Sequence, residues 1–209
     1  MKTDIIINEG FASAINDGIR GLDDKTISYH VLPIVFRNLD ADKWIEIWST
    51  RVRSRKIMRG FIYDNHPTDY NDRKNLLIIC KSMGVVETYD VLDEMWEAIR
   101  HYNHIGLVCI DGHSKLLKEL FKRRYGEKRD FYRRDDWGDK VTVYNFFQHN
   151  KYPKGAQFVG ADYEYSFTNK QNEGDPGLVD HFSIIYQTPV LDAVESMCQN
   201  MIDEGSDKS

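Results

Sequence analysis

Asp111, Gly112 and His113 follow an apolar run, and their side chains could do acid–base or metal chemistry. The run is residues 105–110, IGLVCI, and it predicts a buried strand. A carboxylate and an imidazole directly after such a strand could act as general acid and base, or could bind a metal ion. The glycine between them could leave backbone N–H groups open to an anion. A helix is predicted over 114–125, however, and ordinary strand-to-helix punctuation needs the same residue types, so punctuation is the default interpretation.

Two further histidines, His101 and His104, come shortly before this strand and extend the metal hypothesis. With Asp111 and His113 they would form a set of neutral imidazoles and one carboxylate. The HxxH and DxH spacings match no tightly spaced ligand motif, and histidines at a helix end are expected from the helix dipole alone. We therefore predict no metal and no other cofactor, and keep these four residues as the metal candidates to test.

Basic residues gather in two segments of a chain whose formal net charge is −5. Residues 51–60 carry +5 and residues 115–134 carry +6, so the rest of the chain sums to −16. Arginine binds carboxylate and phosphate through its planar fork, and neighbouring aromatic rings stack on bases or fill protein interfaces. The predicted binding surface combines these residue types and consists of Arg51, Arg53, Arg55, Arg123, Arg124, Tyr125, Arg129, Tyr132, Arg133, Arg134 and Trp137.

Three functions are open on these observations. The first is a non-catalytic binding or assembly protein that uses the Arg/aromatic surface to contact a protein partner or copies of itself, for which a virus or phage component is one context. Patches of opposite charge on one chain suit such head-to-tail association. The second is an enzyme that acts on a phosphate-bearing small molecule or nucleic acid through Asp111 and His113. The third is a nucleic-acid-binding protein without chemistry, although nucleic-acid contacts usually come with a basic domain.

Nucleophilic catalysis is not predicted. The sequence has no GxSxG pentapeptide and no phosphate loop, and Cys109 lies inside the predicted strand, where thiols are usually inert. Asp162 and Glu164 with His181 could be grouped as an acid–base set, but their alternation with aromatic residues is typical of the polar face of a strand. The balance favours a protein without catalysis.

Composition and cysteine usage bound the class of protein. Hydrophobic residues make up 41% and charged residues 29%, which favours a folded core over disorder. Cys80, Cys109 and Cys198 are odd in number and far apart, so we expect reduced thiols and a cytoplasmic location. The N-terminus lacks the pattern of a secretory signal, and no apolar run approaches the roughly 18 residues of a membrane span, so we expect a soluble protein without membrane contact.

Hydrophobic periodicity predicts the elements that would position these residues. Helices are predicted over 40–52, 90–102 and 114–125 and from Thr188 onward, and strands over 28–36, 58–63, 105–110, 141–148, 156–167 and 180–187. Residues 75–84 fit a helix that ends at Gly84 or a buried strand. The last three strands are read as an antiparallel sheet. The predicted fold class is therefore α+β: a helix-rich N-terminal two-thirds packed with a C-terminal antiparallel sheet and a final helix, in one domain over 1–209 with a connector at 126–140.

Overall fold

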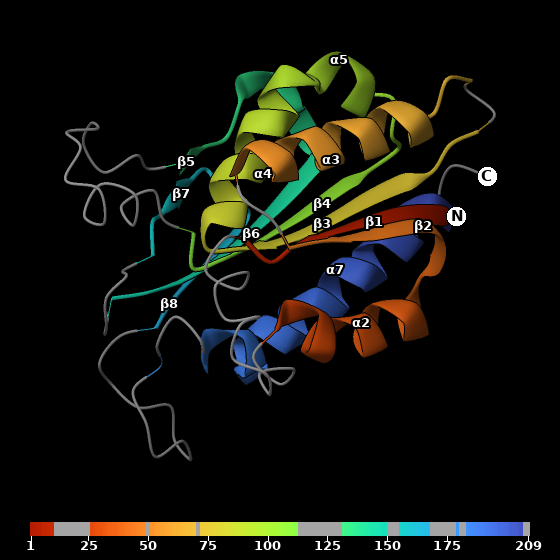
Figure 1. Cartoon of the computed structure of the whole chain (residues 1–209). Helices are drawn as coiled ribbons and strands as arrows, with labels where there is room; N and C mark the ends of the chain where they lie inside the picture. Colours follow the sequence, from red (N-terminus) through yellow and green to blue (C-terminus); the bar gives the residue numbers. More distant parts are fainter. Residues whose placement is uncertain are drawn as a thin grey trace.

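The computed structural model contains one central sheet of six parallel strands (Figure 1). It describes residues 1–10, 26–48, 51–69, 72–112, 131–149, 155–167, 179 and 183–206. The strand order is β2-β1-β3-β4-β6-β8, and each neighbouring pair is parallel. The strands are β1 (Lys2–Asn8), β2 (Asp40–Ile47), β3 (Asn75–Lys81), β4 (Ile105–Ile110), β6 (Val141–Gln148) and β8 (Tyr163–Phe167). A separate pair of short parallel strands consists of β5 (Phe131–Tyr132) and β7 (Phe158–Val159).

Helices cover both faces of the central sheet. They are α2 (Ile27–Asn38), α3 (Arg51–Asn65), α4 (Met83–Glu94), α5 (Trp96–Ile99) and α7 (Thr188–Ser206), with 3-10 turns η2 (Asp135–Lys140) and η3 (Ser183–Tyr186). The helices α3, α4 and α5 lie on the upper face in Figure 1, and α2 and α7 lie on the lower face. This is an α/β arrangement in which helices alternate with parallel strands.

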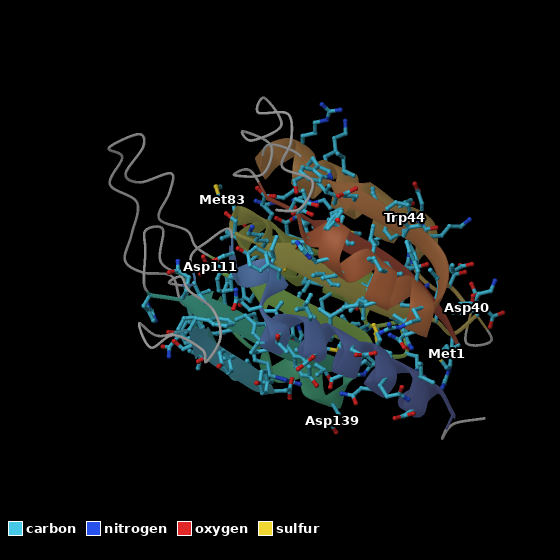
Figure 2. The ribbon with its side chains drawn as sticks, turned by 90° about the horizontal axis from the view of Figure 1, so that it is seen from below. Met1, Asp40, Trp44, Met83, Asp111 and Asp139 are labelled. Atoms are coloured by element: carbon cyan, nitrogen blue, oxygen red, sulfur yellow. The ribbon has the colours of Figure 1, made fainter. Side chains whose placement is uncertain are left out.

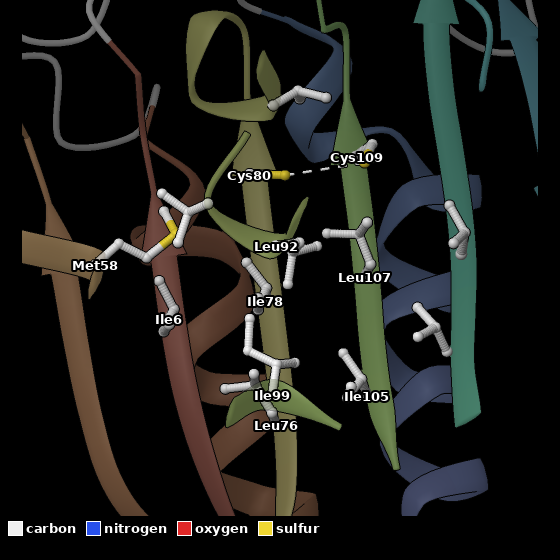
Figure 3. Packing of buried hydrophobic residues seen from close by; sticks show 14 of the residues in the cluster. Ile6, Met58, Leu76, Ile78, Cys80, Leu92, Ile99, Ile105, Leu107 and Cys109 are labelled. Carbon is white, nitrogen blue, oxygen red and sulfur yellow. Dashed lines mark hydrogen bonds between the residues drawn. The ribbon is translucent and has the colours of Figure 1, made fainter. Parts of the chain in front are cut away.

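The central strands are buried on both faces, which explains their continuous apolar sequences. Every residue of β3 and β4 is buried. Ile78 and Cys80 of β3 pack into the upper-face cluster with helices α3 to α5 (Figure 3). Leu77 and Ile79 pack into the lower-face cluster with α2 and α7. A parallel strand between two helical layers has no polar face, so its sequence does not alternate.

The predicted α+β class with a C-terminal antiparallel sheet is wrong. The strand β6 matches the predicted strand 141–148 and β8 lies within 156–167, but the two pair in parallel, with β7 in the connection between them. The alternation of aromatic and polar residues in β8 is typical of a half-buried strand. It does not indicate whether the neighbouring strand runs parallel or antiparallel. Of the predicted strand 180–187, the described part includes the 3-10 turn η3 and no strand.

Three other predicted elements have the opposite type in the structure. The predicted strand 28–36 is helix α2, the predicted strand 58–63 lies inside helix α3, and the predicted helix 40–52 begins as strand β2. The buried residues Ile27, Val31 and Val35 follow a four-residue period and fit a helix better than a strand. The strand β2 lies at the edge of the sheet and is largely uncovered, so it shows no clean alternation.

Other predictions are confirmed. The predicted strand 105–110 is β4, and the last helix begins at Thr188. The sequence left residues 75–84 open between helix and strand, and residues 75–81 form strand β3. The predicted helix 90–102 corresponds to the end of α4 and to the short helix α5. Helix α4 begins earlier than predicted, at Met83. The predicted helix 114–125 lies outside the described residues.

Two further features concern the connector and the cysteines. Within the predicted connector 126–140, the described residues 131–140 include β5 and η2. The three cysteines are free and buried. Among the described helices, none is long and apolar enough to cross a membrane.

We expect Ile78→Ala to lower the free energy of unfolding by about 2–5 kcal/mol, because it leaves a cavity at the centre of the upper-face cluster. Tyr63→Ala is the control, since the Tyr63 side chain on α3 is 72% exposed, and its effect should stay within roughly 0.5 kcal/mol. Urea denaturation of both variants checks this. Equal losses for the two substitutions would contradict the assignment of β3 to the core.

Candidate functional site

The carboxyl ends of the parallel strands form one edge of the sheet, which we call the carboxyl edge. Met83 and Asp111 lie at this edge, and Met1 and Asp40 lie at the opposite amino edge (Figure 2). The strand β1 pairs with β2 on one side and with β3 on the other, so the chain reverses its direction of travel across the sheet between β1 and β3. In open α/β sheets, ligands bind outside the carboxyl ends of the strands at such a switch point.

Two residues with strained backbones lie side by side at the carboxyl edge. Ser82 has φ 57° and Asp111 has φ 49°, and they are the non-glycine residues with positive φ in the described part of the chain. Each directly follows its strand, and the register that pairs Lys81 with Ile110 makes Ser82 and Asp111 the next neighbours. Such a conformation costs roughly 1–3 kcal/mol per residue and persists where the surrounding structure enforces it, which is common at functional sites.

Ser82 forms the turn between a strand and a helix. The strand β3 ends at Lys81 and α4 begins at Met83, so a single residue with φ 57° and ψ −127° joins them. The N–H of Ser82 donates to the carbonyl oxygen of Ile110 at 3.0 Å, which fixes the turn to the neighbouring strand. The first N–H groups of α4 have no acceptor within the helix, and the helix dipole adds partial positive charge there. Ser82 therefore carries a hydroxyl beside donors that suit a negatively charged oxygen.

Two glycines allow the backbone to come close around this turn. A Cβ atom on Gly84 would lie 2.5 Å from the carbonyl oxygen of Asn8, so helix α4 meets strand β1 without room for a side chain. A Cβ atom on Gly10, which has φ +73°, would lie 2.6 Å from the carbonyl oxygen of Lys81 and 2.8 Å from the backbone nitrogen of Gly84. The segment after β1 is thus in direct contact with the Ser82 turn.

Asp111 is fully buried and held by two donors from β6. Its Oδ1 accepts the backbone N–H of Gln148 at 3.1 Å, and its Oδ2 accepts the Gln148 side-chain amide at 3.3 Å. The Asp111 N–H donates to Phe146, and a Cβ on Gly155 would lie only 2.3 Å from Asp111 Oδ1. The carboxylate is therefore fixed in position one strand away from Ser82.

The structure separates the predicted metal candidates. Asp111 lies at the carboxyl edge, whereas His104 directly precedes β4 at the amino edge, so the length of the strand, roughly 20 Å, lies between them. His101 is exposed and lines a polar hollow of about 390 Å³ with Arg73, Arg100 and Lys140. His113 lies outside the described residues. Among the described residues, no group of three or more His, Cys, Asp or Glu side chains is placed to hold a metal ion.

Several members of the predicted Arg/aromatic surface bind within the chain itself. Arg55 pairs with Asp90 and Glu94. Arg133 pairs with Asp162, and Arg134 pairs with Asp93 and Asp136.

The remaining members differ in their surroundings. Trp137 is buried in an aromatic cluster, Tyr132 is exposed, and Arg53 lines a shallow hollow beside α3. The other members are Arg123, Arg124, Tyr125 and Arg129, which lie outside the described residues together with the side chain of Arg51. The binding role of this surface stays a prediction.

Sequence reasoning missed Ser82. Its neighbourhood is Cys80-Lys81-Ser82-Met83-Gly84, which departs from the GxSxG pattern only in its first residue. Cysteine is small and Cys80 is buried against Cys109, with the two sulfur atoms 3.9 Å apart (Figure 3). A search for a small residue, rather than glycine, two positions before the serine would have found this turn.

Comparison with known proteins adds no assignment. No protein-family model matches the chain, and no curated protein matches it significantly. The function is therefore argued from the geometry of the carboxyl edge.

We expect Gly84→Ala to lower the free energy of unfolding by about 1–3 kcal/mol, because the added methyl group overlaps the Asn8 backbone. Gly60→Ala is the matched control: Gly60 also lies in a helix, and a Cβ there meets nothing within 4 Å. This control should stabilise the protein by up to about 1 kcal/mol through helix propensity alone. Chemical denaturation measures the free energy of unfolding of both variants. An increase for Gly84→Ala would show that α4 does not pack closely against β1.

Proposed function

We propose that the protein is a serine hydrolase that cleaves carboxylic esters or related acyl compounds, with Ser82 as the nucleophile. The observation that supports this best is the backbone of Ser82, strained at φ 57° and ψ −127° on a single-residue turn between a parallel strand and a helix. In α/β-hydrolases a nucleophilic serine lies on such a strained strand-to-helix turn, called the nucleophile elbow. The likeness is one of local geometry and sheet type, and the chemistry is argued from the site.

The proposed reaction proceeds in two steps through an acyl-enzyme. Ser82 Oγ attacks the carbonyl carbon of the ester, its proton passes to a histidine, and the carbonyl oxygen becomes an oxyanion. The bond to the alcohol oxygen then breaks, and the alcohol leaves with the proton from the histidine. A water molecule repeats the sequence on the acyl group, which releases the carboxylic acid and restores the serine.

The N-terminus of α4 stabilises the oxyanion in this proposal. The residue after the nucleophile, Met83, supplies one backbone N–H in a nucleophile elbow, and the loop after a neighbouring strand supplies another. The corresponding loop here begins at Gly10, which is packed against the backbone of Gly84. Donors fixed before the reaction lower the barrier because they need no reorganisation when the charge develops.

Asp111 is the proposed acid that orients the histidine. It follows Ser82 in the chain, as in the order serine, acid, histidine of α/β-hydrolases, and its strand is adjacent to that of the serine. The histidine is then one that follows Asp111: His149 directly follows Gln148, which binds Asp111, while His113 and His181 lie outside the described residues. Substitution of each of the three by glutamine identifies the base.

Ser82 has no exposed surface. We therefore expect small activated esters, such as p-nitrophenyl acetate, to be better first substrates than bulky ones.

The roles predicted from the sequence alone, protein assembly and nucleic-acid binding through the Arg/aromatic surface, stay as predictions. They have less support than hydrolysis, because Arg55, Arg133 and Arg134 are paired with acidic residues of the same chain. The sequence suggested that Asp111 acts on a phosphate-bearing substrate. In the function proposed here, Asp111 takes part in acyl transfer instead.

We expect Ser82→Ala to abolish the hydrolysis of p-nitrophenyl acetate, with kcat lower by roughly a million-fold, because no other group forms the acyl-enzyme. Ser166→Ala is the control, since Ser166 is an exposed serine on β8. Release of p-nitrophenol from purified protein measures both. Ser82→Ala with the activity of the parent protein would overturn the proposed function.

We expect Asp111→Asn to lower kcat roughly 10,000-fold, because an amide cannot hold the histidine in the required tautomer. Asparagine has the same shape but one acceptor oxygen, so the variant loses one of the two hydrogen bonds from Gln148, and thermal denaturation checks that it still folds. A folded Asp111→Asn variant with normal kcat would remove Asp111 from the site and leave Ser82 to be judged on its own.

A further inference from the structure

A polar hollow lies at the amino edge of the sheet, at the far end of the strands from Ser82. Its volume is about 390 Å³, and its lining includes residues from the segments that lead into β3, β4 and β6. The register pairs Leu76 with Ile105 and Ile105 with Val141, so the starts of these three strands are adjacent. The residues that precede the strands are therefore brought together, although they are far apart in the sequence.

Three basic side chains, one from each of these segments, line the hollow. Arg73 lies before β3, Arg100 follows α5 in the segment before β4, and Lys140 directly precedes β6. Lys140 Nζ donates to the backbone carbonyl oxygen of Arg100 at 2.5 Å, which places the ammonium group beside that segment. Of the described residues that line the hollow, Asp69 alone carries a carboxylate. Positive charge therefore exceeds negative charge in this lining, although the formal net charge of the chain is −5.

Hydrogen bonds fix the buried side of the hollow. Tyr102 has no exposed surface, and its hydroxyl donates to Asp4 Oδ2 at 2.9 Å. The backbone N–H of Asn103 donates to the carbonyl oxygen of Lys74 at 2.9 Å, and the Asn103 side-chain amide donates to Asn75 Oδ1 at 3.4 Å. The segment before β4 is thus tied to β1 and β3. A ligand in the hollow would meet side chains on a fixed backbone, which lowers the cost of ordering them.

The acidic groups near these cations lie at the surface. Glu97 pairs with Arg100 at 2.8 Å, but the Glu97 side chain is 80% exposed and the Arg100 side chain is 53% exposed. Ion pairs at this exposure contribute little free energy. Asp69, and Asp139 beside Lys140, are exposed as well. An anion that contacts two or three of the cations at once can therefore compete with these carboxylates.

We propose that this hollow binds the phosphate group of a small phosphorylated polyol or sugar. A phosphomonoester carries about −1.5 to −2 charge at neutral pH and has three acceptor oxygens, which suit arginine forks and an ammonium group. The volume falls within the range of small-molecule sites, roughly 300–1,000 Å³, so it has room for an organic body besides the phosphate. Thr68 and Asn103 supply uncharged polar groups that can bind the hydroxyls of such a body.

A nucleic acid fits the hollow less well. Single-stranded nucleic acid is bound by a basic groove with aromatic rings on which the bases stack. Tyr102 lines the hollow but is buried, so its ring offers no exposed face to a base. The hollow lies at the opposite edge of the sheet from Ser82 and Asp111. This proposal therefore goes beyond the proposed hydrolase and does not rest on it.

Isothermal titration calorimetry of the full chain with glycerol 3-phosphate tests the proposal. Succinate is a dianion without phosphate, glycerol lacks the phosphate, and inorganic phosphate lacks the polyol. We expect glycerol 3-phosphate to bind with a Kd below about 1 mM and about tenfold more tightly than succinate. Inorganic phosphate should bind more weakly than glycerol 3-phosphate, and glycerol should not bind.

Substitutions in the hollow should change the affinity for glycerol 3-phosphate in both directions. Arg100→Met and Lys140→Met should each raise the Kd about tenfold, because each removes one charge-assisted contact. Asp69→Asn should lower the Kd about fivefold, because it removes a repulsive charge. Arg53→Met is the matched control: it changes the net charge equally, but Arg53 lines the other hollow, beside α3, so the Kd should not change. Thermal denaturation checks that all four variants fold.

Several results would overturn the proposal. These are no saturable binding of glycerol 3-phosphate, equal affinity for succinate or inorganic phosphate, and an unchanged Kd in Arg100→Met and Lys140→Met. Tighter binding of a short single-stranded oligonucleotide would assign the hollow to nucleic acid instead. Ser82→Ala should bind glycerol 3-phosphate like the parent protein, and loss of binding in that variant would place the ligand at the carboxyl edge. Binding and esterase activity are measured separately, so either claim can fail without the other.

Discussion

The parallel pairing of β3 with β1 on one side and with β4 on the other is the constraint on which the site depends. It places the ends of three strands at one edge and aligns Glu9 with Lys81 and Ser82 with Asp111. Without that register Ser82 would still form a turn, but Asp111 and Gly10 would not lie beside it. The helices cover both faces of this sheet, and a single residue, Ser82, separates β3 from α4.

The buried charged residues at the two edges of the sheet have different surroundings. At the amino edge, Asp4 is held by Lys74 and by the hydroxyl of Tyr102, whose pKa rises because it is buried beside the carboxylate. Burial raises the pKa of Asp4 itself, although the hydrogen bonds from Lys74 and Tyr102 oppose this. The buried polar groups at the amino edge therefore bond to one another. At the carboxyl edge the charges lie next to strained backbone and to the start of a helix, which is where chemistry can use them.

The sequence indicates the burial of individual segments better than their partners. The burial of the β3 and β4 segments and the helix start at Thr188 could be predicted because they depend on local pattern. The assignments of α2 and β2 failed because α2 is rich in β-branched residues and contains Pro33, while β2 is an edge strand with polar residues on both faces. The antiparallel sheet failed because strand direction is decided by connections, which leave no local signal.

In the candidate site, too, local pattern identified one residue and missed what depends on long-range contacts. Asp111 was singled out because it ends an apolar strand, and that strand end lies at the carboxyl edge. It was grouped with His101 and His104 because they are close in sequence. The strand β4 lies between them, so they are at opposite edges of the sheet. Ser82 escaped notice because its defining feature is a backbone conformation, which no local sequence pattern reports. Its N–H is bonded to Ile110, and the adjoining residues Lys81 and Gly84 pack against Gly10.

The most direct test of the account is to treat the folded protein with a small fluorophosphonate and map the modified residue by peptide mass spectrometry. An activated serine displaces fluoride from phosphorus and keeps the phosphonyl group, whereas an ordinary buried serine does not react. The account predicts one adduct, on Ser82, that is lost when the protein is unfolded before treatment. Absence of any adduct, or an adduct on a different serine, would contradict it.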